Sequence, residues 1–266
     1  MNKSYLFALV VALIIQSCAT VPVTGRKQLK LLPSSQMLSM SASEYSSFLN
    51  EKAPLPASNA KARNLKDIGE DIAAATEKYL RDNGHKSMID NFDWTFNLVE
   101  DETVNAWCMP GGRVVFYTGI LPICKNDNGI AAVMGHEVAH AVARHGNERM
   151  SQQLAIQGAG MSLSTLLQEE PQLTHDLALQ AFGLGSQFGI LAYSRKHESE
   201  ADKMGLIFMA IAGYDPREAV EVWKRMAEVG GQQPPEFLST HPSHETRIEE
   251  LNAYMDEALK YYSPGN

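Results

Sequence analysis

Most of the chain repeats an apolar residue every three or four positions, which is the pattern of amphipathic helices. Residues 59–82 illustrate this pattern: Leu65, Ile68 and Ile72 fall on one helical face, and Asn83-Gly84 closes the segment. Nearly everything after residue 128 follows the same period. We therefore expect helices over 34–50, 59–82, 128–146, 148–168, 172–192, 194–212, 216–229 and 243–261.

A short stretch in the first half of the chain has a period of two instead. From Phe92 to Leu98, apolar and polar side chains alternate, as they do on a half-buried strand. A second β-rich run covers 114–117, and 103–106 is a candidate short strand. Pro110-Gly111-Gly112 between them has the composition of a turn. The predicted fold class is mainly α, of the α+β type, with one small antiparallel sheet.

The first 17 residues have the composition of a bacterial signal peptide. A positive charge at Lys3 precedes ten consecutive apolar residues, Leu6 to Ile15, which are too few to span a bilayer as a helix. The following Ile15-Gln16-Ser17-Cys18 resembles a lipobox, which predicts that Cys18 carries a lipid and begins the mature protein. An ordinary signal peptide followed by a coincidental cysteine is the alternative.

These features predict the domain organisation and the location of the protein. We expect a signal peptide at 1–17, a lipidated lead-in at 18–33 and one folded domain at 34–266. Ala19 rather than Asp follows the cysteine, and by resemblance to proteobacterial sorting this favours the outer membrane. The expected location is therefore the bacterial cell envelope, with the domain facing the periplasm.

Composition limits the classes of function. The 266 residues are 44% hydrophobic and 20% charged, which is ordinary for a globular protein. The formal net charge of −8 argues against binding to nucleic acid, because phosphate binding needs surplus cations. The three cysteines form no Cys-x-x-Cys pair. An oxidising compartment permits a disulfide between Cys108 and Cys124, with two buried thiols as the alternative.

The most informative motif is His136-Glu137-Val138-Ala139-His140. On a helix, His136 and His140 share one face, as two ligands of a tetrahedral zinc ion do. Glu137 begins the same turn and can reach a water molecule held at the metal. Two solvated histidines on a helix are the alternative, but the apolar residues around the motif favour a packed helix. We therefore predict one Zn²⁺ ion per chain.

A continuation of the motif does not supply the third ligand that a catalytic zinc site needs. Ala143 and Gly146 stand where the metzincin pattern requires Gly and His. His145 lies nine residues after His136, on roughly the opposite side of a continuous helix. We interpret His145 as structural or solvated.

A downstream acidic segment offers better candidates for the third ligand. Glu198 and Asp202 are four residues apart and share a helical face. One of them can bind the metal while the other accepts a hydrogen bond from a ligand histidine. Spacing alone does not separate Glu198 from Glu200, nor does it exclude His197. An acidic, solvated helix start is the alternative.

Several segments together resemble a known family. They are Pro22–Lys27, Asn105-Ala106 with Pro110-Gly111-Gly112, Gly135–His140, Ser194-Arg195 with Glu198-x-x-Ala201-Asp202, and Thr240–Ser243 with Arg247. The combination resembles the gluzincin family of HtpX, Oma-type and CAAX prenyl proteases, and above all its soluble bacterial lipoprotein members of the LoiP and BepA type. This resemblance implies a zincin-like helical domain with metalloendopeptidase activity.

The resemblance also implies roles for individual residues. Glu198 becomes the third zinc ligand, and Asp202 becomes the hydrogen-bond partner of a ligand histidine. Asn105 falls on the edge strand that binds extended peptide in the family, and Asn105 or His241 is expected to help stabilise the oxyanion. His241 matches a histidine that faces the metal, either as a helper of the oxyanion or as a fourth ligand that blocks the open position. Glu137 acts as the general base.

The substrates implied by the resemblance are unfolded or misassembled envelope proteins, met at the membrane that holds the Cys18 anchor. A chaperone-like lipoprotein that binds unfolded segments with little proteolysis is the alternative. The intact Glu137 argues against it, because binding alone needs no base. An exopeptidase would need a site for a terminal charge, which the sequence does not locate. The sequence leaves the oligomeric state open.

Overall fold

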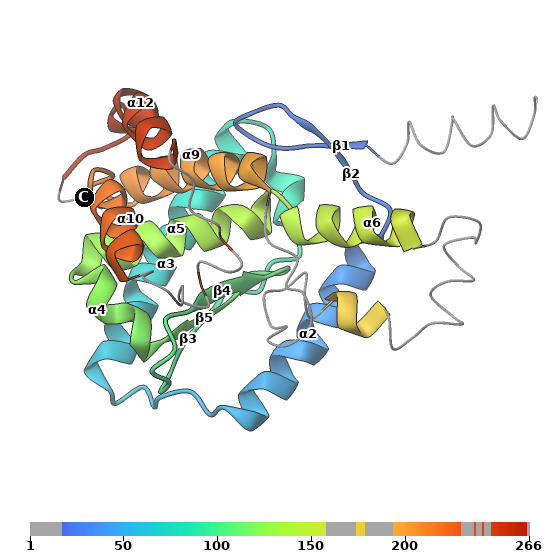
Figure 1. Ribbon diagram of the computed structural model, residues 1–266, viewed down its shortest axis with the longest axis horizontal. Helices are drawn as coiled ribbons and strands as arrows, with labels where there is room; N and C mark the ends of the chain where they lie inside the picture. Colours follow the sequence, from blue (N-terminus) through green and yellow to red (C-terminus); the bar gives the residue numbers. More distant parts are fainter. Residues whose placement is uncertain are drawn as a thin grey trace, which may run out of the picture.

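The computed structural model describes residues 18–157, 174–178, 194–229, 237, 241 and 246–264. Within these ranges helices surround one small sheet (Figure 1), so the mainly α prediction is confirmed. The predicted signal peptide at 1–17, most of the predicted helix 172–192 and the end of 148–168 lie outside the described residues. The described helices are α2 (Ser34–Glu51), α3 (Ala60–Asp82), α4 (Leu121–Cys124), α5 (Asp127–Val142), α6 (His145–Gln157), α9 (Arg195–Ile211), α10 (Glu218–Val229) and α12 (Arg247–Leu259).

The small sheet is mixed, so the prediction of an antiparallel sheet is wrong for one of its two strand pairs. Its strands are β3 (Thr95–Val99), β4 (Ala106–Met109) and β5 (Arg113–Tyr117), in the order β3-β5-β4. The tight turn at Gly111 and Gly112, both with positive φ, folds β4 antiparallel onto β5. β3 pairs with the other side of β5 and runs parallel to it. The alternation of apolar residues predicts strands but carries no information on their direction.

The two faces of this sheet contact different apolar clusters. Trp107, Val115 and Tyr117 face one cluster, which α2 covers with Met37 and Tyr45. The opposite face belongs to a larger cluster shared with α3, α5 and α9, to which the sheet contributes Leu98, Ala106, Cys108, Val114 and Phe116. Both faces of the sheet are therefore buried. α5 packs on the second face through this larger cluster and lies next to the edge strand β4.

Two glycines allow α5 and α9 to approach closely. A Cβ atom at Gly135 would lie 2.9 Å from the carbonyl oxygen of Gly205, and a Cβ atom at Gly205 would lie 2.9 Å from the amide nitrogen of His136. Both distances are too short for a larger side chain without a backbone shift. The contact places the His136-to-His140 segment of α5 beside the first turns of α9, which carry Glu198 and Asp202.

The helix predicted over 128–146 is divided into two. α5 ends at Val142, and Arg144 adopts a left-handed conformation with φ of 59° before α6 begins at His145. This break changes the direction of the chain. His145 therefore does not follow the periodicity of α5, on which its predicted position depended.

The lead-in forms a short hairpin of β1 (Cys18–Thr20) and β2 (Lys27–Leu29), which are antiparallel. The hairpin lies on the side of the molecule that carries α6 (Figure 1). Cys108 and Cys124 are both buried and free, so the alternative of two buried thiols describes this structure. Within the described ranges, no helix has the length and apolar character needed to cross a bilayer.

Candidate metal centre

Four buried side chains from separate parts of the chain meet at one point. His136 and His140 come from α5, Glu198 comes from the first turn of α9, and His241 precedes α12. One ligand atom from each residue lies within 4.8 Å of the others. All four are at most 3% exposed. Of the described residues, this is the group of histidine and acidic side chains that could hold a metal ion.

The spacing of the donor atoms fits a tetrahedral zinc ion. His140 Nε2 lies 3.0 Å from His136 Nε2 and 3.3 Å from Glu198 Oε1. His241 Nδ1 lies 3.2 Å from both His136 Nε2 and Glu198 Oε1. Ligands at zinc bond lengths of about 2.0–2.1 Å in tetrahedral geometry lie about 3.3 Å from one another. Two imidazoles and a carboxylate are also the ligand types that zinc takes in catalytic sites.

Each histidine of α5 has a partner at the nitrogen that points away from the cluster. His136 Nδ1 lies 2.9 Å from Asp202 Oδ1, as the sequence predicts for a partner of a ligand histidine. His140 Nδ1 lies 2.9 Å from His145 Nδ1. With Nδ1–H of His140 donating, His145 accepts at Nδ1 and donates from Nε2 to Glu200 Oε2 at 3.2 Å. These contacts orient both Nε2 atoms toward the cluster.

His145 is therefore structural, but it is not opposite the site. It is fully buried and touches His140, because the helix break at Arg144 redirects the chain. Glu200 and His197, which spacing left open as ligands, lie outside the four-residue cluster. His197 Nε2 contacts Glu148, and Glu200 contacts His145 and Arg26. The side chain that α9 contributes to the cluster is Glu198.

Arg247 is part of this site, although sequence reasoning gave it no role. Its side chain is 1% exposed and donates from Nη1 to Glu198 Oε2 at 2.6 Å and from Nη2 to Asp202 Oδ1 at 2.7 Å. Its guanidinium lies 3.3 Å from the ring centre of Trp223. Only one feature of the sequence pointed to Arg247, namely its place after Thr240–Ser243 in the family pattern. A lone arginine in the first turn of a helix does not otherwise indicate a buried cation.

The cluster perturbs the pKa values of its members. Burial raises the pKa of Glu198, but the nearby His241 and Arg247 outweigh burial and hold that pKa well below its usual range. Burial lowers the pKa of His140 well below its usual range, although the contact with Glu198 opposes this. Burial also lowers the pKa of His136, but Asp202 and Glu198 outweigh it and raise the pKa to about 9.

Glu137 differs from its neighbours because it is buried without a hydrogen bond at Oε1. Its side chain is 3% exposed, and no described residue hydrogen-bonds to that oxygen. His241 Nε2 lies 3.4 Å away. Burial raises the pKa of Glu137, while His241 and His136 oppose the rise. A buried carboxylate oxygen that makes no hydrogen bond, beside four metal donors, is a candidate acceptor for a water molecule or a substrate atom.

Asn105 is a buried residue that lies directly before the edge strand β4. Its residue is 2% exposed, and its Oδ1 accepts a hydrogen bond from the amide of Ala106. Among the described residues, no hydrogen bond or ion pair joins its side chain to the four residues of the cluster. Its carbonyl oxygen accepts from Tyr117 N–H, which fixes the start of the edge strand β4. Cys18 lies in β1, opposite Leu29.

Comparison with known proteins agrees with this geometry. The sequence pattern of Peptidase family M48 matches residues 59–255, which include α5, α9 and the two histidines of the His-Glu-x-x-His motif. The chain belongs to peptidase family M48. The family resemblance inferred from the sequence is thereby confirmed. M48 metallopeptidases use zinc, and the four-residue cluster is a site that could hold it.

Several M48 relatives are similar over much of this chain. The mitochondrial metalloendopeptidase OMA1 of Schizosaccharomyces pombe is 39% identical over 65% of this chain and 50% of its own length. The human mitochondrial metalloendopeptidase OMA1 is 31% identical over 90% of this chain and 46% of its own. A beta-barrel assembly-enhancing protease of Yersinia pestis is 28% identical over 58% of this chain and 32% of its own. The chain thus spans at most about half the length of these relatives.

Proposed function

We propose that this M48 chain is a zinc-dependent endopeptidase of the bacterial cell envelope. The observation that carries the proposal is the buried Glu137 carboxylate, whose Oε1 lacks a hydrogen bond beside four metal donors. His136, His140 and Glu198 would hold the ion. Bound zinc supplies a Lewis acid that makes a water molecule nucleophilic near neutral pH. A purely binding site would have no need of a buried carboxylate with an unsatisfied oxygen at this position.

Glu137 is the general base in this proposal. Its carboxylate accepts a proton from the attacking water as the oxygen adds to the peptide carbonyl, and it then delivers that proton to the leaving amine nitrogen. The raised pKa of Glu137 suits the first half of the transfer, because a carboxylate with a higher pKa is a stronger base. Arg247 holds Glu198 and Asp202 in position from behind the ligands.

His241 has two candidate roles, and its position supports the role of a fourth ligand. Its Nδ1 lies 3.2 Å from His136 Nε2 and Glu198 Oε1, which are the distances between ligands of one ion. The Phe237 ring stacks on His241 with centres 4.5 Å apart and stabilises this orientation. In the alternative role, His241 moves away from the ion and donates a hydrogen bond to the oxyanion.

The outer edge of β4 is the proposed site for an extended peptide. Tyr117 N–H bonds to Asn105, so in an antiparallel pair the residues that turn their amide and carbonyl groups away from β5 are Ala106 and Cys108. The Ala106 amide already donates to Asn105 Oδ1, so a peptide would pair with the Ala106 carbonyl and with the backbone of Cys108. No described strand pairs with that edge. A substrate strand added there would lie beside α5 and its two histidines.

The proposed location rests on the N-terminal sequence. Residues 1–17 have the pattern of a signal peptide, and Cys18 is the proposed lipid attachment site, so the domain at 34–266 would be held at the outer membrane and face the periplasm. The proposed substrates are unfolded or misassembled envelope proteins. Names of the relatives point to both mitochondrial and beta-barrel assembly proteases, so their location does not transfer by similarity.

Digestion of casein by the wild type and by Glu137→Gln, with the zinc content of both measured, tests the activity. We expect both proteins to bind one zinc ion per chain and only the wild type to cut internal peptide bonds. The rate of the variant should fall by at least about 10²-fold, since a positioned general base contributes that much. Equal rates in the two proteins would show that Glu137 is not the base.

A further inference from the structure

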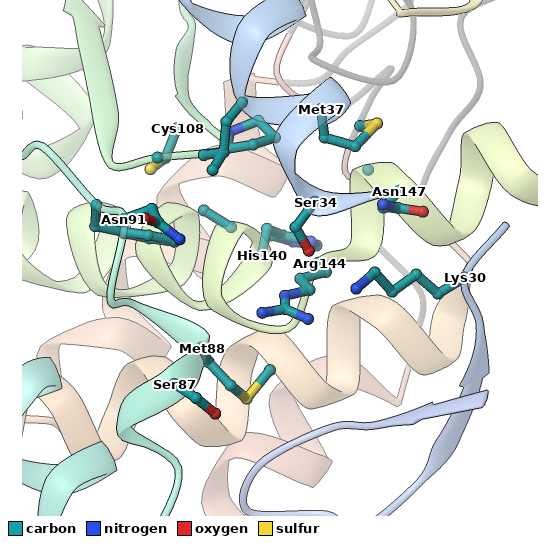
Figure 2. Close-up of a pocket in the computed structure, with 16 residues that line it drawn as sticks. Lys30, Ser34, Met37, Ser87, Met88, Asn91, Cys108, His140, Arg144 and Asn147 are labelled. Carbon is teal, nitrogen blue, oxygen red and sulfur yellow. The ribbon is translucent and has the colours of Figure 1, made fainter. Parts of the chain in front are cut away.

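A second feature of the molecule is a cavity beside the metal centre. Two positively charged side chains and no carboxylate line it. Its volume is about 230 Å³, and it lies between the end of α5, the start of α6, the first turn of α2 and the turn after β4. Figure 2 shows Lys30 and Arg144 among the side chains that line it, with Lys30 extending toward Arg144. None of the 16 lining residues is acidic. The chain as a whole has an excess of acidic residues, so this composition is unusual for it.

The two cations have no counter-ion among the described residues. No hydrogen bond or ion pair is found there for the Arg144 guanidinium or the Lys30 ammonium, whereas Arg26, Arg225 and Arg247 all contact carboxylates. Burial lowers the pKa of Lys30, and the nearby Arg144 lowers it further. Burial also lowers the pKa of Arg144. Two like charges that are partly withdrawn from water repel each other, and a bound anion would relieve that cost.

The backbone places Arg144 in the cavity by a conformation that non-glycine residues adopt rarely. Its φ of 59° is in the left-handed region, at the break between α5 and α6. Such positions cluster at functional sites, where surrounding structure holds them. The break also directs the first turn of α6 at the cavity, since Gly146 and Asn147 line it. Amide groups in the first turn of a helix lack partners within the helix and favour a negative charge.

The cavity is within reach of a peptide that is bound at the metal centre. Its lining includes the ligand His140 and residues of the β4 edge and the turn beyond it, namely Cys108, Pro110 and Gly111. A strand that pairs with Ala106 and Cys108 would project alternate side chains toward α5. A side chain near Cys108 would therefore enter the cavity with Met37, Met88 and Phe92 around its stem and the two cations at its end.

We propose that this cavity is a specificity pocket for an acidic side chain, Asp or Glu, of the substrate peptide. The proposal rests on the endopeptidase function and identifies a property of its substrates. Arg144 and Lys30 bind the carboxylate, and the hydroxyl groups of Ser34 and Ser87 in the same lining are further donors. The apolar part of the lining favours the longer Glu over Asp.

Matched peptides test the pocket. A quenched fluorescent peptide that the wild type cuts at a single bond is prepared with Glu, Gln or Lys at each position flanking that bond. At one position we expect kcat/KM to be roughly tenfold higher for Glu than for Gln, and lower again for Lys, because a charge-assisted hydrogen bond replaces a neutral one. In Lys30→Gln and Arg144→Gln the Glu-to-Gln ratio should fall toward one.

The control variant is Lys61→Gln, which removes an exposed cation at the start of α3. It should keep the wild-type ratio. Glutamine has an unbranched Cβ like arginine, so Arg144→Gln is expected to leave the backbone conformation at the helix break unchanged. Lys30→Gln is a second variant that lies outside that break. A ratio of one at every position of the wild type, or an unchanged ratio in both pocket variants, would overturn the proposal.

Failure of the specificity pocket can be distinguished from failure of the proposed endopeptidase function. If casein is cut but the ratio is one everywhere, the pocket assignment fails and the endopeptidase stands. If no peptide is cut, fluorescence anisotropy with zinc-loaded protein measures binding of the Glu and Gln peptides directly. Tighter binding of a Glu peptide that is lost in Lys30→Gln and kept in Lys61→Gln supports the pocket in that case. Equal binding of the two peptides overturns it.

Discussion

His145 lies directly behind the candidate zinc ligand His140, with their Nδ1 atoms 2.9 Å apart. Glu200 accepts from the far nitrogen of His145, and Arg26 and Thr24 of the lead-in bind that carboxylate in turn. The lead-in hairpin is therefore connected to the metal centre through two buried side chains, His145 and Glu200. His136 has a shorter connection of the same kind, through Asp202 to Arg247.

Removal of the His145 side chain should weaken zinc binding. In His145→Ala, the Nδ1–H of His140 loses its acceptor, so we expect zinc affinity to fall by about 10- to 100-fold, the usual effect of losing a partner of a ligand histidine. Competition with a chromophoric chelator measures it. His145→Asn places an amide oxygen near the lost Nδ1 and should recover part of the affinity.

The matched control is His175→Ala, which removes a half-exposed histidine that contacts Glu44. That variant should bind zinc like the wild type. Equal zinc affinity in His145→Ala and His175→Ala would show that the contact behind His140 does not support the ligand.

Loss of Arg247 should destabilise the metal-free protein strongly. In Arg247→Met, the carboxylates of Glu198 and Asp202 stay buried without their cation, which we expect to lower the free energy of unfolding by about 3–5 kcal/mol. Zinc replaces part of the missing positive charge, so saturating zinc should restore more stability to this variant than to the wild type. Denaturant unfolding with zinc and with a chelator measures both.

The control for that experiment is Arg81→Met, in which the lost cation is 58% exposed and faces Glu77. Its stability should change by less than about 1 kcal/mol, because exposed ion pairs contribute little. A similar loss of unfolding free energy in the two variants would mean that Arg247 is not needed to compensate the buried carboxylates of Glu198 and Asp202.

The sign of the effect at His241 decides between its two roles. If Nδ1 of His241 binds the ion and blocks the open position, His241→Ala should raise the rate of casein digestion. If His241 instead donates to the oxyanion, the same change should lower the rate by up to about 10²- to 10³-fold. X-ray absorption at the zinc edge counts the protein ligands of the resting enzyme. A wild-type rate together with three ligands would reject both roles.

Acid should weaken the contact between the lead-in and the domain. Burial raises the pKa of Glu148 and Glu200, but hydrogen bonds from Arg26, His197 and His145 outweigh burial and lower both values to about 2. Carboxylates with a lowered folded-state pKa stabilise the fold above their unfolded-state pKa of about 4.3. That contribution is lost as the pH falls from about 4.3 toward 2.

Arg26→Gln should therefore be less stable than the wild type at pH 7 and lose less stability between pH 5 and pH 2.5. Urea unfolding at both pH values measures the difference. The control Lys78→Gln breaks an exposed pair with Asp82 and should follow the wild-type pH dependence. Parallel pH profiles for Arg26→Gln and the wild type would show that the lead-in contact does not titrate.

The helices, and the spacing of the ligands within each of them, can be predicted from the sequence alone. A periodicity of 3.6 residues places His136 and His140 on one face of α5, and it gives Glu198 and Asp202 one face of α9, because both relations are local. Apolar alternation likewise identified the strands. These inferences need only the geometry of one element. Within the described residues the helices and strands lie near their predicted positions, except that the helix predicted over 128–146 is divided at Arg144.

Which of these local faces meet depends on how the helices pack against one another. The Gly135–Gly205 contact sets the approach of α5 to α9, and that approach directs Glu198 into the cluster while Glu200 turns toward His145. The parallel pairing of β3 with β5 likewise joins residues that are far apart in sequence. Arg247 is buried for the same reason, since its two carboxylate partners lie 45 and 49 residues away in the chain. Periodicity describes one element at a time, and only packing brings the charges of separate elements together.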